Sequence, residues 1–204
     1  MSSDDPYLFD DVPVLRNLLN IRDEDELQKA ECDITYIKLL DIDKLAYRAR
    51  FDLRYLQKLH AYIFGDLYDW AGSLRTVPLV KGEEVLGGDT VRYDAPEDIA
   101  RDVEEITAQL RRTPWKNASI DETAELFAHE IAALWQAHPF REGNTRTVIT
   151  FATQFAAKHN FPMDKQLLKD SADYVRRALV KASDGKYSDY SYLEKIFTDA
   201  IVRG

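Results

Sequence analysis

The stretch His-Pro-Phe-Arg-Glu-Gly-Asn-Thr-Arg-Thr, residues 138–147, is a polar segment between two apolar segments with helical spacing. We predict that Gly143 lets the backbone turn, and that Asn144 is the N-cap of the helix that follows. The N–H groups at a helix start are unpaired and lie at the positive end of the helix dipole. This turn is therefore a candidate anion site, and the residue types of the stretch suit phosphate chemistry.

The charged residues of the stretch predict a site for a metal-bound nucleotide. Arg146, in the first turn of the predicted helix, offers a forked donor to a second phosphate. Phosphates would repel Glu142 unless a cation intervened, so Glu142 is a candidate Mg²⁺ ligand, directly or through water. His138 can take a proton from an attacking hydroxyl at neutral pH, because its usual pKa is about 6.5. The alternative is an ordinary loop with a packed histidine. We favour the site because a candidate base, a metal ligand and an anion site follow one another in this stretch.

These residues resemble the signature of the Fic family, His-x-Phe-x-Asp/Glu-Gly-Asn-Gly-Arg-x-x-Arg. The positions that match in register are His138, Phe140, Glu142, Gly143, Asn144 and Arg146. The resemblance extends to Asp5-Pro6-Tyr7, Leu18-Leu19-Asn20-Ile21 and Asp69-Trp70-Ala71-Gly72. Two positions depart from the signature. Thr145 replaces the second glycine, and Ile149 replaces the final arginine, which in the family contacts the terminal phosphate of ATP.

The resemblance implies an enzyme that transfers AMP from ATP to a Tyr, Thr or Ser hydroxyl of a target protein, with Mg²⁺ as cofactor. It implies that His138 is the general base and that Glu142 holds the metal. The nucleotide-binding residues would be Gly143, Asn144, Thr145 and Arg146. Two alternatives stay open: a phosphotransferase like the Doc branch of the superfamily, and a catalytically weak interaction module, which the two departures suggest.

Apolar residues recur at helical spacing over most of the chain, which predicts an all-α fold. The residues that suit helix starts are Pro13, Asp23, Asp52, Pro96 and Ser119. Two further helices are expected at about 164–182 and 189–202. His60 lies on the apolar stripe of its helix, so we expect a packed histidine and not a metal ligand. The length fits a single Fic-type domain, 1–204, with its core at about 50–180.

Residues 76–93 are rich in β-branched residues and glycines, which predicts a small β-hairpin. In the Fic family a flap occupies this place, covers the active site and pairs with an extended segment of the target. We therefore expect Val80, Lys81, Gly82 and Val91 to dock the target. A plain connecting loop is the alternative, because a proline and a long interval weaken the strand pattern.

Composition limits the classes of function. The formal net charge of −9 argues against a general nucleic-acid binder, because such proteins need basic surfaces. No apolar run approaches the roughly 18–20 residues that a membrane span needs, and residues 1–5 lack the basic and apolar pattern of a signal peptide. The single Cys32 fits a reducing cytosol. We expect a cytoplasmic protein without nucleic-acid or membrane partners.

The sequence also makes a prediction about regulation. Many Fic proteins are restrained by a helix of pattern Ser/Thr-x-x-x-Glu-Gly/Asn, whose Glu pairs with the final arginine of the signature. No Ser or Thr of this chain has a Glu four residues later, and the arginine position is Ile149. We therefore expect control from a separate, antitoxin-like protein, from expression or from access to the target.

Overall fold

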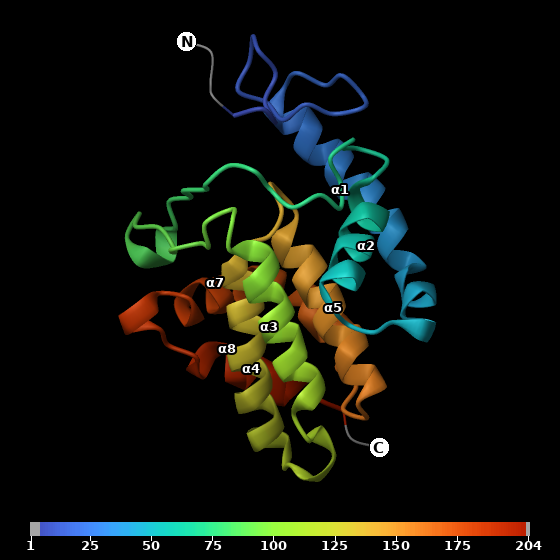
Figure 1. The fold of residues 1–204 in the computed structure, drawn as a ribbon, viewed down its shortest axis with the longest axis vertical. Helices are drawn as coiled ribbons and strands as arrows, with labels where there is room; N and C mark the ends of the chain where they lie inside the picture. The colour runs from blue at the N-terminus through green and yellow to red at the C-terminus, as the bar shows by residue number, and fades with distance from the viewer. Residues whose placement is uncertain (1–4, 203–204) are drawn as a thin grey trace.

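The computed structural model describes residues 5–202 and is built from α-helices (Figure 1). The α-helices are α1 (Glu24–Leu40), α2 (Leu53–Phe64), α3 (Ile99–Arg112), α4 (Ile120–Ala137), α5 (Asn144–Lys158), α6 (Lys165–Asp170), α7 (Ala172–Ala182) and α8 (Ser191–Ala200). Short 3-10 turns are η1 (Ile42–Arg48), η2 (Glu84–Leu86), η3 (Trp115–Asn117) and η4 (Gly185–Tyr187). The predicted all-α fold is confirmed. The single-domain organisation stays a prediction, and its residues 1–4 and 203–204 lie outside the described residues.

Capping side chains explain where three helices begin. Asp23 and Asp52 each accept the backbone N–H three residues further on, at the starts of α1 and α2. Ser119 forms a reciprocal capping box with Glu122 at the start of α4. These bonds satisfy backbone donors that have no partner within the helix, and they confirm three of the predicted helix starts.

Two of the predicted helix starts are wrong. Pro13 begins no helix, because its segment folds back on itself through an antiparallel bridge between Leu8 and Leu15. The helix expected from Pro96 begins at Ile99, after a turn. Local propensity does not distinguish a turn from the first turn of a helix at a proline, since both use the same φ.

The two C-terminal helices predicted at 164–182 and 189–202 are also corrected. The first is divided at Ser171 into α6 and α7, and the second is the shorter α8. Asp164 caps α6, accepting the N–H groups of Gln166 and Leu167. The division lets α6 and α7 each pack on α8.

The segment 76–93 turns back on itself around η2, but the predicted β-hairpin is not confirmed. Gly82 and Thr90 form one isolated antiparallel bridge, and the Glu83 N–H donates to the Asp89 oxygen over 2.8 Å. Within residues 5–202 the segment forms no longer ladder. Pro78 supplies no N–H for a ladder. We call residues 76–93 the flap below.

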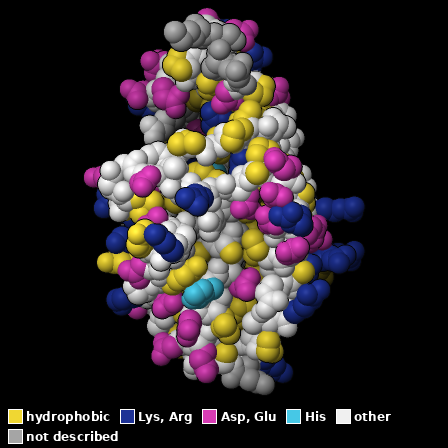
Figure 2. All heavy atoms as spheres, turned by 60° about the vertical axis from the view of Figure 1, so that its left-hand side comes forward, with side chains coloured by type: hydrophobic (Ala, Val, Ile, Leu, Met, Phe, Trp, Pro, Cys, Tyr) yellow, Lys and Arg dark blue, Asp and Glu magenta, His cyan; other side chains and the backbone are white. Residues whose placement is uncertain are grey.

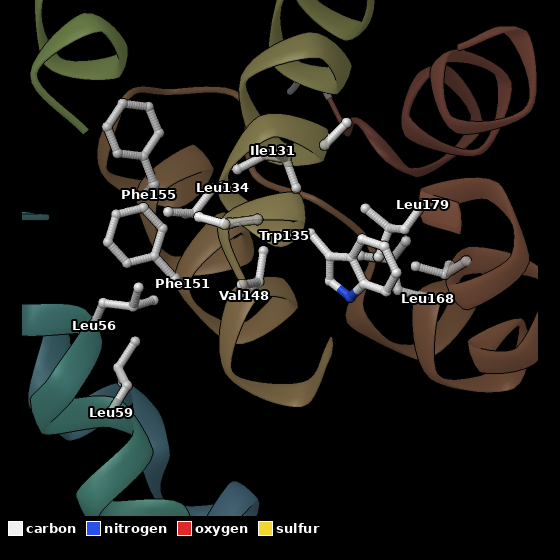
Figure 3. Packing of buried hydrophobic residues seen from close by; sticks show 14 of the residues in the cluster. Leu56, Leu59, Ile131, Leu134, Trp135, Val148, Phe151, Phe155, Leu168 and Leu179 are labelled. Carbon is white, nitrogen blue, oxygen red and sulfur yellow. The ribbon is translucent and has the colours of Figure 1, made fainter. Parts of the chain in front are cut away.

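Helices α4 and α5 form the centre of the molecule (Figure 1). Helix α4 packs on α3, α7 and α8, while α5 packs on α2, which α1 covers from outside. The buried side chains between them are aromatic and aliphatic, and Figure 3 shows Leu134 of α4 with Val148, Phe151 and Phe155 of α5. Each such side chain stabilises the fold by about 1.5–3 kcal/mol. The loop between α4 and α5 is therefore anchored at both ends in the core.

The surface carries both signs of charge. Figure 2 shows acidic and basic side chains interspersed over one face, with apolar side chains between them. No helix within residues 5–202 has the length and apolar character that crossing a bilayer requires.

Candidate active site

The loop from His138 to Gly143 joins α4 to α5 through two sharp backbone turns. Helix α4 ends where His138 takes the left-handed conformation, with φ of 46°, and its N–H bonds the Trp135 oxygen. Helix α5 begins after Gly143, whose φ is 79°. A Cβ at Gly143 would lie 2.3 Å from the ring of Phe64, so both the conformation and the close approach require glycine.

Asn144 braces the loop from inside. Its Oδ1 accepts the Phe140 N–H over 2.9 Å, and its Nδ2 donates to the Phe140 oxygen over 2.8 Å. The predicted N-cap role is wrong, because Gly143 holds the cap position and the Asn144 amide is engaged across the loop. Among the residues that the structure describes, no side chain caps α5. Its first backbone N–H groups can therefore receive an anion.

Arg75, immediately before the flap, holds the backbone of the loop. Its N–H donates to the Pro139 oxygen over 2.9 Å, and its Nε donates to the His138 oxygen over 2.7 Å. Other guanidinium N–H groups donate to the backbone oxygens of Val77 and Asp94. The side chain is only 2% exposed, and burial lowers its pKa from the usual value. Arg75 was not predicted, and the nearest sequence signal is the family-like segment that ends at Gly72.

His60 supports the loop from α2. Its Nδ1 accepts the Gly72 N–H over 2.8 Å, so Nε2 carries the proton. Nε2 donates to the backbone oxygen of Glu142 over 2.9 Å. The ring stacks on Phe140 with centroids 3.9 Å apart. Burial lowers the pKa of His60 to about 4, so the ring is neutral at pH 7. The predicted packed histidine is confirmed, and the structure adds its contact with the loop.

His138 is 4% exposed and contacts two aromatic side chains that also contact each other. Its ring centroid is 4.0 Å from that of Tyr93 and 5.3 Å from that of Trp135. Its Nδ1 lies 3.3 Å from the Trp135 oxygen, which makes Nδ1 the protonated nitrogen. Its Nε2 is buried without a hydrogen-bond partner among the described residues. Burial, and then the charge of Lys81, lowers the pKa to about 3, which leaves a neutral imidazole that can accept a proton at Nε2.

Glu142 is an ionised carboxylate beside a cation. Its Oε1 accepts the Gly143 N–H over 2.9 Å, and its Oε2 lies 3.0 Å from the Lys81 ammonium. Burial alone would raise the pKa of Glu142, but Lys81 and the Gly143 N–H lower it to about 2. Among residues 5–202, no group of three or more His, Cys, Asp or Glu comes together as a metal cage. A metal ion here would have Glu142 as a single charged protein ligand.

Arg146 points from the first turn of α5 toward α1. It donates through Nη1 to Thr35 Oγ1 over 2.8 Å and through Nη2 to the Glu31 carboxylate. The Tyr68 hydroxyl donates to the other Glu31 oxygen over 2.7 Å. These bonds orient the guanidinium and leave further N–H donors for a phosphate. Helix α1 is thus part of the site, although no spacing in the sequence connects Glu31 with Arg146.

The four predicted docking residues of the flap have different surroundings. Val80 is 81% exposed, while Val91 is 1% exposed and packs in the core, which leaves only its backbone for a partner. Lys81 contacts Glu142, and Gly82 forms the isolated bridge.

The flap is also attached to α7 by a contact that was not predicted. The buried Glu83 carboxylate accepts two N–H bonds from Arg176, of 2.8 and 2.9 Å. Arg176 therefore holds the flap at its turn, and Glu142 holds it at the active-site loop.

We expect acid to destabilise the fold through His60 and His138. Their folded pKa values of about 4 and about 3 lie below the ordinary 6.5. Between these values, the two histidines bind protons in the unfolded chain but not in the folded chain. This stability is present above pH 6.5 and is lost as the pH falls toward the folded values. Thermal unfolding followed by circular dichroism should show a falling midpoint over this range. His60→Gln should reduce the proton linkage by about one proton near pH ~5, and an unchanged linkage would contradict the assignment.

Comparison with known proteins places this site in a family context. The model of the Fic/DOC family matches residues 50–156. The chain is 32% identical over 163 residues to the protein adenylyltransferase VbhT of Bartonella schoenbuchensis, a match that covers 79% of this chain and 33% of VbhT. It is 32% identical over 176 residues to the probable protein adenylyltransferase y4lH of Sinorhizobium fredii, covering 81% of this chain and 82% of y4lH. Thus the chain spans about a third of VbhT and most of y4lH.

A solved structure has the same fold. The BepC effector of Bartonella tribocorum, with bound AMPPNP, superposes with a TM-score of 0.79 at 20% identity. The match covers 97% of this chain and 97% of the BepC chain. The arrangement of helices around the loop is therefore shared along nearly the whole chain.

Proposed function

The chain belongs to the Fic/DOC family, and from that premise we propose that it transfers AMP from ATP to a Tyr, Thr or Ser hydroxyl of a target protein. The observation that carries the proposal is His138, a buried neutral imidazole whose Nε2 has no partner among the described residues. Beside it lie the ionised Glu142 and the uncapped start of α5. The names of the relatives and the AMPPNP bound to BepC support a nucleotide substrate.

In the proposed reaction, the phosphates of ATP bind at the start of α5. The backbone N–H groups of Asn144 and Thr145 and the remaining donors of Arg146 would hold them. Nε2 of His138 takes the proton of the target hydroxyl, whose oxygen attacks the α-phosphorus in line. The bond from the α-phosphorus to its bridging oxygen breaks, and pyrophosphate leaves. The target then carries AMP, and His138 carries the proton.

Glu142 fits the Mg²⁺ that accompanies such a nucleotide. Mg²⁺ is usually held by one or two carboxylates, with substrate phosphates and water completing its coordination. The ammonium of Lys81, 3.0 Å from Oε2, supports the proposal that this carboxylate favours a cation. When bound, the metal would neutralise phosphate charge and orient the nucleotide. Glu142 would hold it.

The proposal extends to partners and location. The exposed Val80 and the backbone near Gly82 would contact an extended segment of the target. Regulation would come from a separate, antitoxin-like protein, from expression or from access to the target, because residues 1–204 contain neither the inhibitory pattern nor the arginine that it would pair with. The single Cys32 supports a cytoplasmic location.

Labelled ATP tests the proposal and separates its alternatives. The protein is incubated with a cell lysate and Mg²⁺, once with ATP labelled at the α-phosphate and once at the γ-phosphate. Label from the α position, with a matching mass increase on a hydroxyl side chain, supports AMP transfer. Label from the γ position would instead indicate a Doc-like phosphotransferase. No transfer under conditions where calorimetry shows ATP binding would indicate an interaction module.

We expect Ile149→Arg to tighten ATP binding. Ile149 is half-buried against the core one turn beyond Arg146, at the final arginine of the signature. A charge-assisted bond to the terminal phosphate contributes about 1.5–3 kcal/mol, or roughly 10- to 150-fold in affinity. Titration calorimetry should show the gain for ATP and a smaller one for ADP. Ile149→Met is the control, and a folded Ile149→Arg that binds ATP no better would place the terminal phosphate elsewhere.

A further inference from the structure

Thr145 and Trp135 are joined across the helices on either side of the active-site loop. The indole Nε1–H of Trp135, on α4, donates to Oγ1 of Thr145, on α5, over 2.9 Å. An indole nitrogen only donates, so the threonine hydroxyl is the acceptor. Trp135 is 1% exposed, and Figure 3 shows its ring projecting from α4 among buried aliphatic side chains. Without Thr145 this buried donor would lack its acceptor, and the ring would move or stay unsatisfied.

Trp135 contacts His138 in two ways. The two rings meet edge to face, at 88° with centroids 5.3 Å apart. The backbone oxygen of Trp135 lies 3.3 Å from Nδ1 of His138. Tyr93 also lies against the imidazole, with its ring centroid at 4.0 Å, and it contacts the Trp135 ring, with centroids 5.9 Å apart. The position of the Trp135 ring therefore limits how the imidazole can rotate.

We propose that Thr145 is a positioning residue for His138. Its hydroxyl holds the Trp135 ring, the Trp135 and Tyr93 rings, which contact each other, together hold the imidazole, and Nδ1–H then faces the Trp135 backbone oxygen. Nε2 is thereby kept as the proton acceptor. The signature has glycine at this position, which offers no side-chain acceptor, so this link is a property of the present chain. The inference rests on the proposed function, in which His138 is the general base.

Three variants test the link. Thr145→Val keeps the shape and removes the hydroxyl, Thr145→Ser keeps the hydroxyl, and Thr153→Val is the control. Thr153 lies on the same helix, and its hydroxyl bonds within α5, to the Thr150 oxygen over 3.0 Å. The ring nitrogens of His138 and the indole N–H of Trp135 are observed by ¹⁵N NMR, which needs no catalysis. Transfer of α-label gives kcat and the KM for ATP.

For Thr145→Val we expect a shifted, faster-exchanging indole N–H signal and a mixture of His138 tautomers. We expect kcat to fall about 10-fold with KM unchanged, which is part of the about 10²–10⁴-fold that a general base supplies. Thr145→Ser should restore both spectra and rate, and Thr153→Val should change neither. If Thr145→Val does not fold, Thr145→Gly removes the same hydroxyl without burying a methyl group. The same spectra of His138 and Trp135 then test the link.

Two results would overturn the inference. One is a Thr145→Val protein with a single Nδ1–H tautomer and wild-type kcat. The other is a raised KM with unchanged kcat and spectra, which would make Thr145 a nucleotide contact only. If the wild-type protein transfers no AMP, the proposed function fails by itself. The tautomer spectra then still show whether Thr145 holds the imidazole.

Discussion

Replacing His138 with Ala should lower AMP transfer by about 10²–10⁴-fold, because the variant loses the group that accepts the proton of the target hydroxyl. Binding of ATP should change little, since the start of α5 and Arg146 do not depend on the imidazole. The fold should persist, because Nε2 of His138 bonds to nothing among the described residues. Transfer of α-label measures the loss, calorimetry measures ATP binding, and circular dichroism measures the fold.

The matched control is His129→Ala. His129 lies on the same helix but is exposed there and stacks on Tyr190 of a distant segment. This variant should transfer label at the wild-type rate. A His138→Ala protein that transferred as fast as its control would remove His138 from the role of general base.

Replacing Glu142 with Gln should lower transfer about 100-fold, or about 2.7 kcal/mol, which is part of the several kcal/mol that a metal ion contributes at developing charge. The amide has nearly the same shape but carries no charge for Mg²⁺. The Lys81 ammonium also loses its ionised partner. The response to magnesium should therefore weaken together with the rate. A magnesium titration of both transfer and ATP binding measures the effect.

Glu125→Gln is the control for the charge change, because Glu125 is exposed on α4 and away from the loop. It should leave the magnesium titration unchanged. If Glu142→Gln reached half its maximal rate at the wild-type magnesium concentration, Glu142 would not be a metal ligand. Its ion pair with Lys81 would then serve only to hold the flap.

Short-range patterns in the sequence were sufficient for much of the fold. Asp52 and Ser119 begin helices as predicted, because a capping side chain reaches a backbone N–H only three residues away. The loop at 138–146 was found for the same reason, since His138, Glu142 and Arg146 lie close in the chain wherever that chain folds. Pro13 and Asn144 show where this reasoning fails. Both are residue types that suit a helix start. The backbone around Pro13 instead folds back through the bridge between Leu8 and Leu15, and the Asn144 side chain bonds Phe140 across the loop.

The residues that support the site come from far along the chain, and only the tertiary structure identified them. Arg75 donates to the backbone oxygen of His138, 63 positions away, and His60 donates to the backbone oxygen of Glu142, 82 positions away. The Glu31 carboxylate accepts from Arg146, 115 positions away. Helical periodicity showed that His60 is packed, but periodicity describes one face of one helix and does not say which loop that face meets.

The sequence by itself therefore determined the helices and the chemical groups of the loop, because capping, periodicity and neighbouring residue types act within a few positions. The tertiary structure decided the state of those groups. Burial lowers the pKa of His138 to about 3, and Lys81, from the flap, helps to keep Glu142 ionised. Both effects depend on how tightly distant segments pack around the loop. That packing is the joint result of many weak contacts between α1, α2, α4, α5 and the flap, which no single stretch of the chain specifies.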